Sequence, residues 1–418
     1  MKRAGNLFDR ICSWENLEVA ATRARRRKRY RLYAENFELR RETILRNIRG
    51  ELLDGTWRPR PYRVFTIFDP KERVISAPAY RDRLVHHALC NVIGPVIERT
   101  LIAQSYSCRI GLGTGAARES CRKMIRRYSH VLKLDVRKYF PSIDHILLKE
   151  KLRRLIKCSR TLALTDVIID SWKEPDPEPL WFPGDDLLAP VGRARGLPIG
   201  SLTSQLFANL FLSRIDHLVQ EELKPGGYAR YTDDLLLFDD DKSRLGAMLA
   251  RMIEEFQRER LKPHPTKCRV HACREGVPFL GFRYWRDRVR VLRENRLRFE
   301  RRTNAEKRAL GERWVECAGS PDSLRGRNQM FRPSLSCSQA DHAVAPALCC
   351  RRDGSPGGVS PLDVARSAYG WFQFVSEYPI NLGLIRAECR HHGLSGVNPS
   401  SSGSNRVLRG GSWNNNAR

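Results

Sequence analysis

Two apolar segments, VLKLDVRKYFPSID at residues 131–144 and YARYTDDLLLFDDD at residues 228–241, carry aspartate where a buried strand should have none. Asp135 ends one apolar run, whereas Asp233 and Asp234 precede another. An unpaired carboxylate is costly to desolvate at such a place. Divalent cations held by carboxylates from two adjacent strands would remove this cost, and nucleotidyl transfer needs the same arrangement.

The composition of the chain points to a polyanionic partner. Its 418 residues include 75 lysines and arginines against 47 aspartates and glutamates, which gives a formal net charge of +28. This length predicts two to three domains. Because no apolar run approaches the roughly 18 residues that span a bilayer, we expect a cytoplasmic protein with no membrane partner.

The N-terminal region contains the run RARRRKRYR at residues 23–31 within a stretch rich in helix formers. Seven basic residues without interleaved acids repel one another unless an anion neutralises them. We interpret residues 1–56 as a basic helical arm, with a merely solvated helix face as the alternative. The residues expected to contact nucleic acid are Arg25, Arg26, Arg27 and Lys28.

Further local patterns predict the course of the remaining chain. We expect a hairpin at 63–77, a proline-rich loop at 174–190, a turn and amphipathic helix at 196–223, a strand at 277–285, a basic helix at 288–314, a poorly ordered insertion at 317–360 and a helix at 362–378.

The ordered motifs over about residues 57–290 resemble those of reverse transcriptases. RVISAPAYRDRLVHHAL (73–89) and SYSCRIGLGTGAA (105–117) resemble the two fingers motifs, LDVRKYFPSID resembles the first palm motif, and RYTDD resembles the YxDD turn. The resemblance implies an α+β right-hand polymerase whose palm is an antiparallel sheet backed by helices. The expected boundaries are a basic arm at 1–56, fingers at 57–128 and 146–190, a palm at 129–145 and 191–289, a helical thumb at 290–390 and a flexible tail at 391–418.

The same resemblance assigns the catalytic carboxylates. Asp135, Val136 and Asp233 would be metal-binding positions for two Mg²⁺ ions, with Mn²⁺ as a substitute, and Asp234 would be a third catalytic carboxylate. The alternative is that Asp135 and Asp233 only cap strand ends.

The positions expected to bind the incoming nucleotide are Arg73, Arg109, Phe140, Ile199, Gly200 and Lys267. By resemblance, Arg73 and Arg109 would hold the triphosphate, since a guanidinium offers several donors to phosphate oxygens. Phe140 would lie beneath the sugar and exclude a 2′-hydroxyl, and Lys267 would assist the leaving pyrophosphate. Ordinary salt bridges, a core phenylalanine and an exposed lysine are the respective alternatives.

The element GLPIGSLTSQ at residues 196–205 departs from the usual pattern. Most reverse transcriptases have glutamine at the position of Ile199, which precedes the second glycine, Gly200. This departure resembles the reverse transcriptases of diversity-generating retroelements, which copy a template repeat with errors at adenines. Isoleucine cannot form a hydrogen bond, so an apolar surface that tolerates mismatch would replace a polar constraint. Alternatively, Ile199 packs without influencing fidelity.

The resemblance also implies partners. These are dNTPs, a template RNA, the RNA/DNA hybrid and a small basic accessory protein that forms a ring. The tail RVLRGGSWNNNAR at residues 406–418 resembles the variable repeat of the proteins that such elements diversify. The alternative functions are a retron or defence-type reverse transcriptase, and an RNA-binding protein like an intron maturase without catalysis.

Overall fold

The structure is a computed structural model that describes residues 2–26, 31–68, 72–175 and 178–318. The described residues divide into two units, residues 2–280 with 284–287 and residues 281–283 with 288–318. The helix predicted at 362–378 and the tail lie outside the described residues, as does nearly all of the predicted insertion.

An antiparallel four-stranded sheet is the scaffold of the first unit, with the strand order β4-β5-β3-β6. The two aspartate-bearing segments predicted from the sequence are neighbours in it, because β3 pairs directly with β5. Apolar side chains on both faces keep the central strands buried. The four strands are β3 (His130–Asp135), β4 (Gly227–Tyr231), β5 (Asp234–Asp239) and β6 (Arg269–Ala272).

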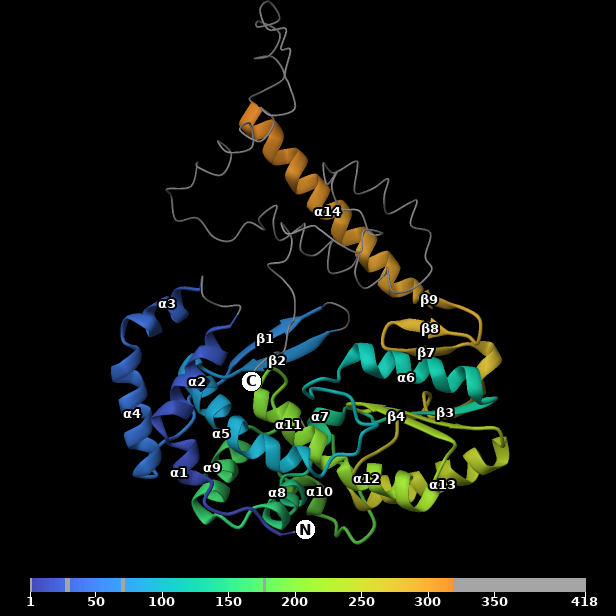
Figure 1. The fold of residues 1–418 in the computed structure, drawn as a ribbon, viewed down its shortest axis with the longest axis horizontal. Coiled ribbons are helices and arrows are strands. Elements are labelled where there is room, and N and C mark those ends of the chain that lie inside the picture. Colours follow the sequence, from blue (N-terminus) through green and yellow to red (C-terminus); the bar gives the residue numbers. More distant parts are fainter. Residues whose placement is uncertain (1, 27–30, 69–71, 176–177, 319–418) are drawn as a thin grey trace, which may run out of the picture. The chain divides into compact units, whose positions relative to one another are not determined.

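Helices cover both faces of this sheet (Figure 1). Helix α6 (Thr114–Arg127) contacts β4 and β5, whereas α13 (Lys242–Arg258) packs against β3, β5 and β6 on the opposite face. Asp241 begins α13 by accepting the backbone N–H of Ser243 at 2.7 Å. Apolar residues at helical spacing then face the sheet, so α13 is amphipathic. They are Leu245, Met248, Met252 and Phe256.

The predicted hairpin at 63–77 is confirmed. β1 (Arg63–Ile67) and β2 (Arg73–Ala77) pair antiparallel, with Ile67 opposite Arg73. All five residues of β1 are exposed. The chain then enters the long helix α5 (Tyr80–Glu98), most of whose length is buried.

The N-terminal segment is helical, as expected for residues 1–56, and it packs against α5. Helix α2 buries Leu17, Ala20 and Ala21, and it packs along α5. These small apolar residues lie on one face of the helix. In the sequence this apolar face is hard to recognise, because a dense run of charged residues begins within the same segment. The segment contains α1 (Phe8–Ile11), α2 (Trp14–Arg25), α3 (Leu32–Leu39) and α4 (Arg41–Leu53).

The helix predicted at 196–223 forms three consecutive pieces. These are α11 (Leu202–Phe211), α12 (Ser213–His217) and the π-helical η1 (Leu218–Leu223). The first piece buries seven of its ten residues, so it is a core helix more than a surface amphipathic one. The preceding helices of this unit are α7 (Tyr139–Ser142), α8 (His145–Leu155), α9 (Ser159–Asp170) and α10 (Ala189–Gly192).

The single strand predicted at 277–285 is interrupted. Leu280 and Gly281 both have positive φ, 45° and 89°, a conformation that a continuous strand does not allow. A 3₁₀ turn, η2 (Cys273–Glu275), and three short strands therefore occupy this region, β7 (Val277–Phe279), β8 (Phe282–Tyr284) and β9 (Val289–Val291).

The second unit contains the basic helix predicted from the sequence. Helix α14 (Arg293–Ala318) confirms the helical spacing and continues through the first two residues of the predicted insertion. Among the described residues, no helix has both the length and the apolar character needed to cross a membrane.

Candidate active site

The sheet brings the three aspartates together at one end. In the register of β3 and β5, Asp135 lies directly opposite Asp234. Tyr231 of β4 pairs with Asp234 of β5, so Thr232 and Asp233 form a two-residue turn at the same end. The expectation that the two segments form adjacent strands is therefore confirmed.

The turn has an uncommon backbone conformation. Thr232 has a φ of 58°, in the left-handed region that β-branched residues rarely adopt. Its hydroxyl forms a hydrogen bond with the hydroxyl of Ser107 at 2.7 Å, and its carbonyl accepts from Arg230 at 3.0 Å. The surrounding side chains therefore hold the turn that carries Asp233 in place.

Electrostatic repulsion is concentrated on Asp233. Burial raises the pKa of this carboxyl to about 6, and the carboxylates of Asp135 and Asp234 add to the increase. Burial also raises the pKa of Asp234, whereas Lys133 opposes that increase. The site therefore disfavours a negative charge on Asp233, chiefly because the carboxyl is buried and also because two carboxylates lie beside it.

Two lysines lie against the carboxylates. Lys267, expected to assist the leaving group, places its Nζ 3.0 Å from Oδ2 of Asp135. Lys133, which the sequence reasoning missed, lies 3.2 Å from Oδ1 of Asp234 and donates to the carbonyl of Pro278 at 2.9 Å. Lys133 precedes Asp135 by two residues in the same strand, so the period of a strand alone places both on one face.

The carboxylates fit a hard divalent cation. Oxygen ligands are those that Mg²⁺ and Mn²⁺ prefer, and the raised pKa of Asp233 reflects charge that a cation would relieve. Within the described ranges, no three His, Cys, Asp or Glu side chains form a ready-made metal site. Instead, Lys267 contacts Asp135 and Lys133 contacts Asp234.

Asp135 and Asp233 would hold the metal once Lys267 moves from Asp135 or shares it. A bound divalent metal would lower the pKa of an attacking hydroxyl and stabilise the leaving pyrophosphate. Val136, the third expected metal position, is buried and forms a β-bridge with Pro263. The amide of His264 donates to the carbonyl of Asp135 at 2.7 Å, which fixes the strand end that carries the carboxylate.

The 196–205 element lies against the hairpin. The amide of Ser76 in β2 donates to the carbonyl of Ile199 at 2.8 Å. Gly200 has a φ of 118°, and a Cβ there would lie 3.0 Å from Cγ2 of Ile75. Arg73 begins β2 and is exposed. The structure thus joins three of the predicted nucleotide-binding positions to one hairpin.

Phe140 connects this element to the loop that follows Asp135. Its carbonyl accepts the amide of Leu197 at 3.0 Å. Phe140 is half-buried, whereas Tyr139 is buried and donates its hydroxyl to the carbonyl of Ala208. The two rings pack edge to face with centroids 5.7 Å apart, and Phe140 is the more accessible one. Its contact with the sugar stays a prediction.

Arg109 is engaged in holding its own loop. Its Nε donates to Glu98 at 2.7 Å, and Nη1 donates to the carbonyls of Ile102 and Ser105. The structure does not place this side chain on the carboxylates. Binding of a triphosphate by Arg109 stays a prediction, and it would compete with these contacts.

His86 was also missed by the sequence reasoning. It is fully buried, and its Nδ1 lies 3.0 Å from the hydroxyl of Ser201, which follows Gly200. Burial lowers the pKa of His86 to about 3, so the imidazole is neutral. In the sequence, the only indication of this contact was a histidine placed among the regularly spaced apolar residues of a helix.

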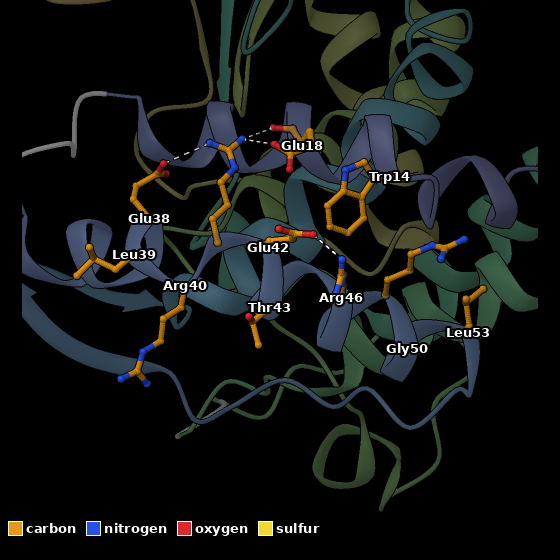
Figure 2. Close-up of a pocket in the computed structure, with 12 residues that line it drawn as sticks. Trp14, Glu18, Glu38, Leu39, Arg40, Glu42, Thr43, Arg46, Gly50 and Leu53 are labelled. Carbon is orange, nitrogen blue, oxygen red and sulfur yellow. Dashed lines mark hydrogen bonds and ion pairs between the residues drawn. The ribbon is translucent and has the colours of Figure 1, made fainter.

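Two of the four residues predicted to contact nucleic acid, Arg25 and Arg26, lie at the end of α2. Arg25 is exposed and lies 3.5 Å from Glu38, Arg26 is exposed, and Arg27 and Lys28 lie outside the described residues. A pocket of about 930 Å³ lies between these N-terminal helices, and Figure 2 shows the residues that line it. Its lining mixes acidic and basic side chains, with Arg46 paired to Glu42, so it does not form a uniformly basic surface.

Neutralising the four basic residues at 25–28 together should flatten the salt dependence of RNA binding. If they touch phosphates, each releases condensed counterions on binding, so the slope of log K against log salt should fall by about one to a few units. Filter binding across a salt series measures this slope. An unchanged slope would contradict the phosphate contacts and assign the segment to solvent or to a protein partner.

A sheet that brings a strand-end aspartate to a Tyr-Thr-Asp-Asp turn, with helices on both faces, defines a nucleotidyl-transferring polymerase domain. A family model described as reverse transcriptase (RNA-dependent DNA polymerase) matches residues 69–284, which is more than half of the chain. The chain belongs to the reverse transcriptase family.

Individual relatives are distant. Protein YkfC of Escherichia coli (strain K12) is 25% identical over 292 residues, a match that covers 59% of this chain and 72% of that protein. The putative COX1/OXI3 intron 1 protein of Saccharomyces cerevisiae is 22% identical over 179 residues, covering 42% of this chain and 20% of that protein. Apo telomerase from Candida tropicalis has a TM-score of 0.41 at 10% identity, covering 60% of this chain and 53% of that one. The chain thus spans about half of the telomerase chain and a fifth of the yeast protein.

Proposed function

We propose that the chain synthesises cDNA on a template-repeat RNA, with errors at adenines, as the polymerase of a diversity-generating retroelement. Family membership supports RNA-directed DNA synthesis. The carboxylates of Asp135 and Asp233 would carry the reaction with two Mg²⁺ ions. The proposed setting is the cytoplasm, with the template RNA and a small basic ring-forming accessory protein as partners.

The environment of Ile199 supports the assignment to a diversity-generating retroelement. Backbone contacts hold this loop against β2, because Ser76 donates to the Ile199 carbonyl and Gly200 packs closely on Ile75. The loop position therefore does not depend on the side chain at 199. That side chain is half-buried and apolar, so it offers no hydrogen bond by which a misplaced nucleotide could be rejected.

Sequencing of the cDNA made on a defined RNA tests the proposal. Errors concentrated at template adenines are the expected result. Faithful copying at all four bases would contradict the retroelement assignment and favour the retron or defence-type alternative. A lack of any polymerisation, in a protein that still binds RNA, would contradict polymerase function.

The similarity to an intron-encoded yeast protein favours a second candidate, an RNA-binding protein that assists an intron. The test is RNA function in an Asp233→Ala protein. Retention of that function without DNA synthesis would support this candidate. Its loss together with DNA synthesis would support the polymerase reading.

Ile199→Gln should lower misincorporation opposite template adenine and spare catalysis at the other bases. A polar side chain can bond a correctly placed nucleotide, and loss of that bond on misplacement costs on the order of 1 to 3 kcal/mol, roughly ten- to a hundredfold in discrimination. Deep sequencing of cDNA from both proteins on one RNA measures the effect.

The matched control is Ile199→Val, which keeps an apolar β-branched side chain and should retain the adenine errors. Equal adenine error rates in the glutamine variant and the wild type would exclude the role given to Ile199.

A further inference from the structure

The guanidinium of Arg230 is completely buried beneath the catalytic turn. Arg230 lies in β4, three residues before Asp233, and it faces Asp216 of α12. Its Nε and Nη2 contact the two oxygens of that carboxylate at 2.7 and 2.6 Å, and both side chains are 0% exposed. This is a two-pronged ion pair that excludes water.

The remaining nitrogen of Arg230 reaches the turn itself. Nη1 donates to the carbonyl of Thr232 at 3.0 Å and to Oδ1 of Asn209 at 3.3 Å. That carbonyl belongs to the peptide bond that joins Thr232 to Asp233. The orientation of this peptide therefore follows the position of the guanidinium.

A second set of contacts supports the same turn. Asn209 donates to the carbonyl of Ser107 at 2.7 Å, and the Ser107 hydroxyl bonds that of Thr232. Tyr228 donates its hydroxyl to Asp216 at 2.7 Å. The turn is thus fixed through its carbonyl by Arg230 and through its side chain by Ser107.

Stability alone does not account for this arrangement. A buried ion pair loses its hydration on folding, and apolar residues of similar volume often serve stability as well or better. The carbonyl contact is what an apolar replacement would not supply. The turn needs that contact because Thr232 is held at positive φ.

We propose that Arg230 and Asp216 are positioning residues that orient the Thr232–Asp233 peptide and thereby aim the Asp233 carboxylate at the metal site shared with Asp135. Neither side chain touches the reacting atoms. The inference rests on the proposed polymerase function, and it adds to that function the buried pair that sets the geometry of the catalytic turn.

Arg230→Lys tests the proposal, because lysine keeps the charge for Asp216 but lacks the fork that also reaches Thr232. In primer extension, kcat should fall at least about tenfold while the KM for dNTP stays within about twofold. The Mg²⁺ concentration for half-maximal activity should rise. The affinity for Mn²⁺, measured by calorimetry without substrate, should fall in parallel.

Lys151→Arg is the matched control. Lys151 and Glu259 form another ion pair, largely buried and 2.9 Å apart, between α8 and the end of α13, away from the turn. This control should leave kcat and Mn²⁺ affinity unchanged. Asp216→Asn, which keeps the shape of the partner, serves if Arg230→Lys does not fold, and it should show the same two losses.

A folded Arg230→Lys protein with kcat and Mn²⁺ affinity within about twofold of wild type would overturn the positioning role. So would equal losses in the Lys151→Arg control, since these would indicate general loosening of the core. If the wild type makes no cDNA, the proposed function fails. The Mn²⁺ measurement then still decides whether the pair organises the carboxylates.

Discussion

Asp233→Ala should abolish cDNA synthesis and leave RNA binding almost unchanged. The substitution removes the carboxylate that the turn brings to Asp135, whereas the basic residues that would hold the nucleic acid lie elsewhere. Because a catalytic metal site supplies many kcal/mol of transition-state stabilisation, the expected loss is several orders of magnitude. Primer extension and filter binding on the same preparation measure the two quantities.

The control is Asp54→Ala, which removes an exposed aspartate at the end of α4. It should leave primer extension unchanged. Extension by Asp233→Ala within about tenfold of wild type would reject Asp233 as a metal ligand.

Asp233→Asn should make the metal-free protein more stable while it inactivates the enzyme. The folded protein holds the pKa of Asp233 at about 6 against an ordinary 3.8, because the carboxylate is buried beside Asp135 and Asp234. A shift of about two units corresponds to as much as about 3 kcal/mol of unfolding free energy lost at neutral pH. The amide keeps the shape of the side chain without the charge.

Because the pKa of Asp233 is raised in the folded protein, its contribution to the free energy of unfolding depends on pH. Between pH 3.8 and about 6 the folded protein retains the proton of Asp233, whereas the unfolded chain has released it. The stability contributed by this group is therefore fully present below the window and falls as pH rises through it. Chemical denaturation of both proteins without metal should show this descending contribution in the wild type alone.

Mg²⁺ and a second variant complete the test. Added Mg²⁺ should raise the unfolding midpoint of the wild type more than that of Asp233→Asn, since a cation that binds only the folded state stabilises it. Asp144→Asn should instead be destabilising, because the buried Asp144 pairs with Arg260 at 2.7 Å and caps α8. A metal-free Asp233→Asn protein no more stable than wild type at pH 7 would contradict the raised pKa of the Asp233 carboxyl.

The local patterns of the sequence were sufficient for the outline of the palm. Aspartates at the ends of apolar runs predicted β3 and β5, and the structure pairs them with Asp135 opposite Asp234. The hairpin and the basic helix α14 were predicted in the same way. Such predictions succeed because strand and helix periods are properties of a few consecutive residues.

The same reasoning said less about how elements pack on partners that are distant in the chain. The run of charge at 23–31 suggested an arm, although α2 buries an apolar face against α5. The strand predicted at 277–285 is divided by two residues with positive φ. The composition of a segment shows its charge and polarity, but whether a narrow apolar face is buried depends on the helix or sheet that packs against it.

The sequence by itself indicated which residues could do chemistry at the site: three aspartates, Lys267 and an isoleucine in place of a polar side chain. Only the tertiary structure decided how they are arranged. It placed Lys267 on Asp135 and Asp216 beneath Arg230. The physical reason is that an ion pair between residues far apart in the chain depends on the packing of whole helices and strands, whereas the period of a strand depends only on its neighbours.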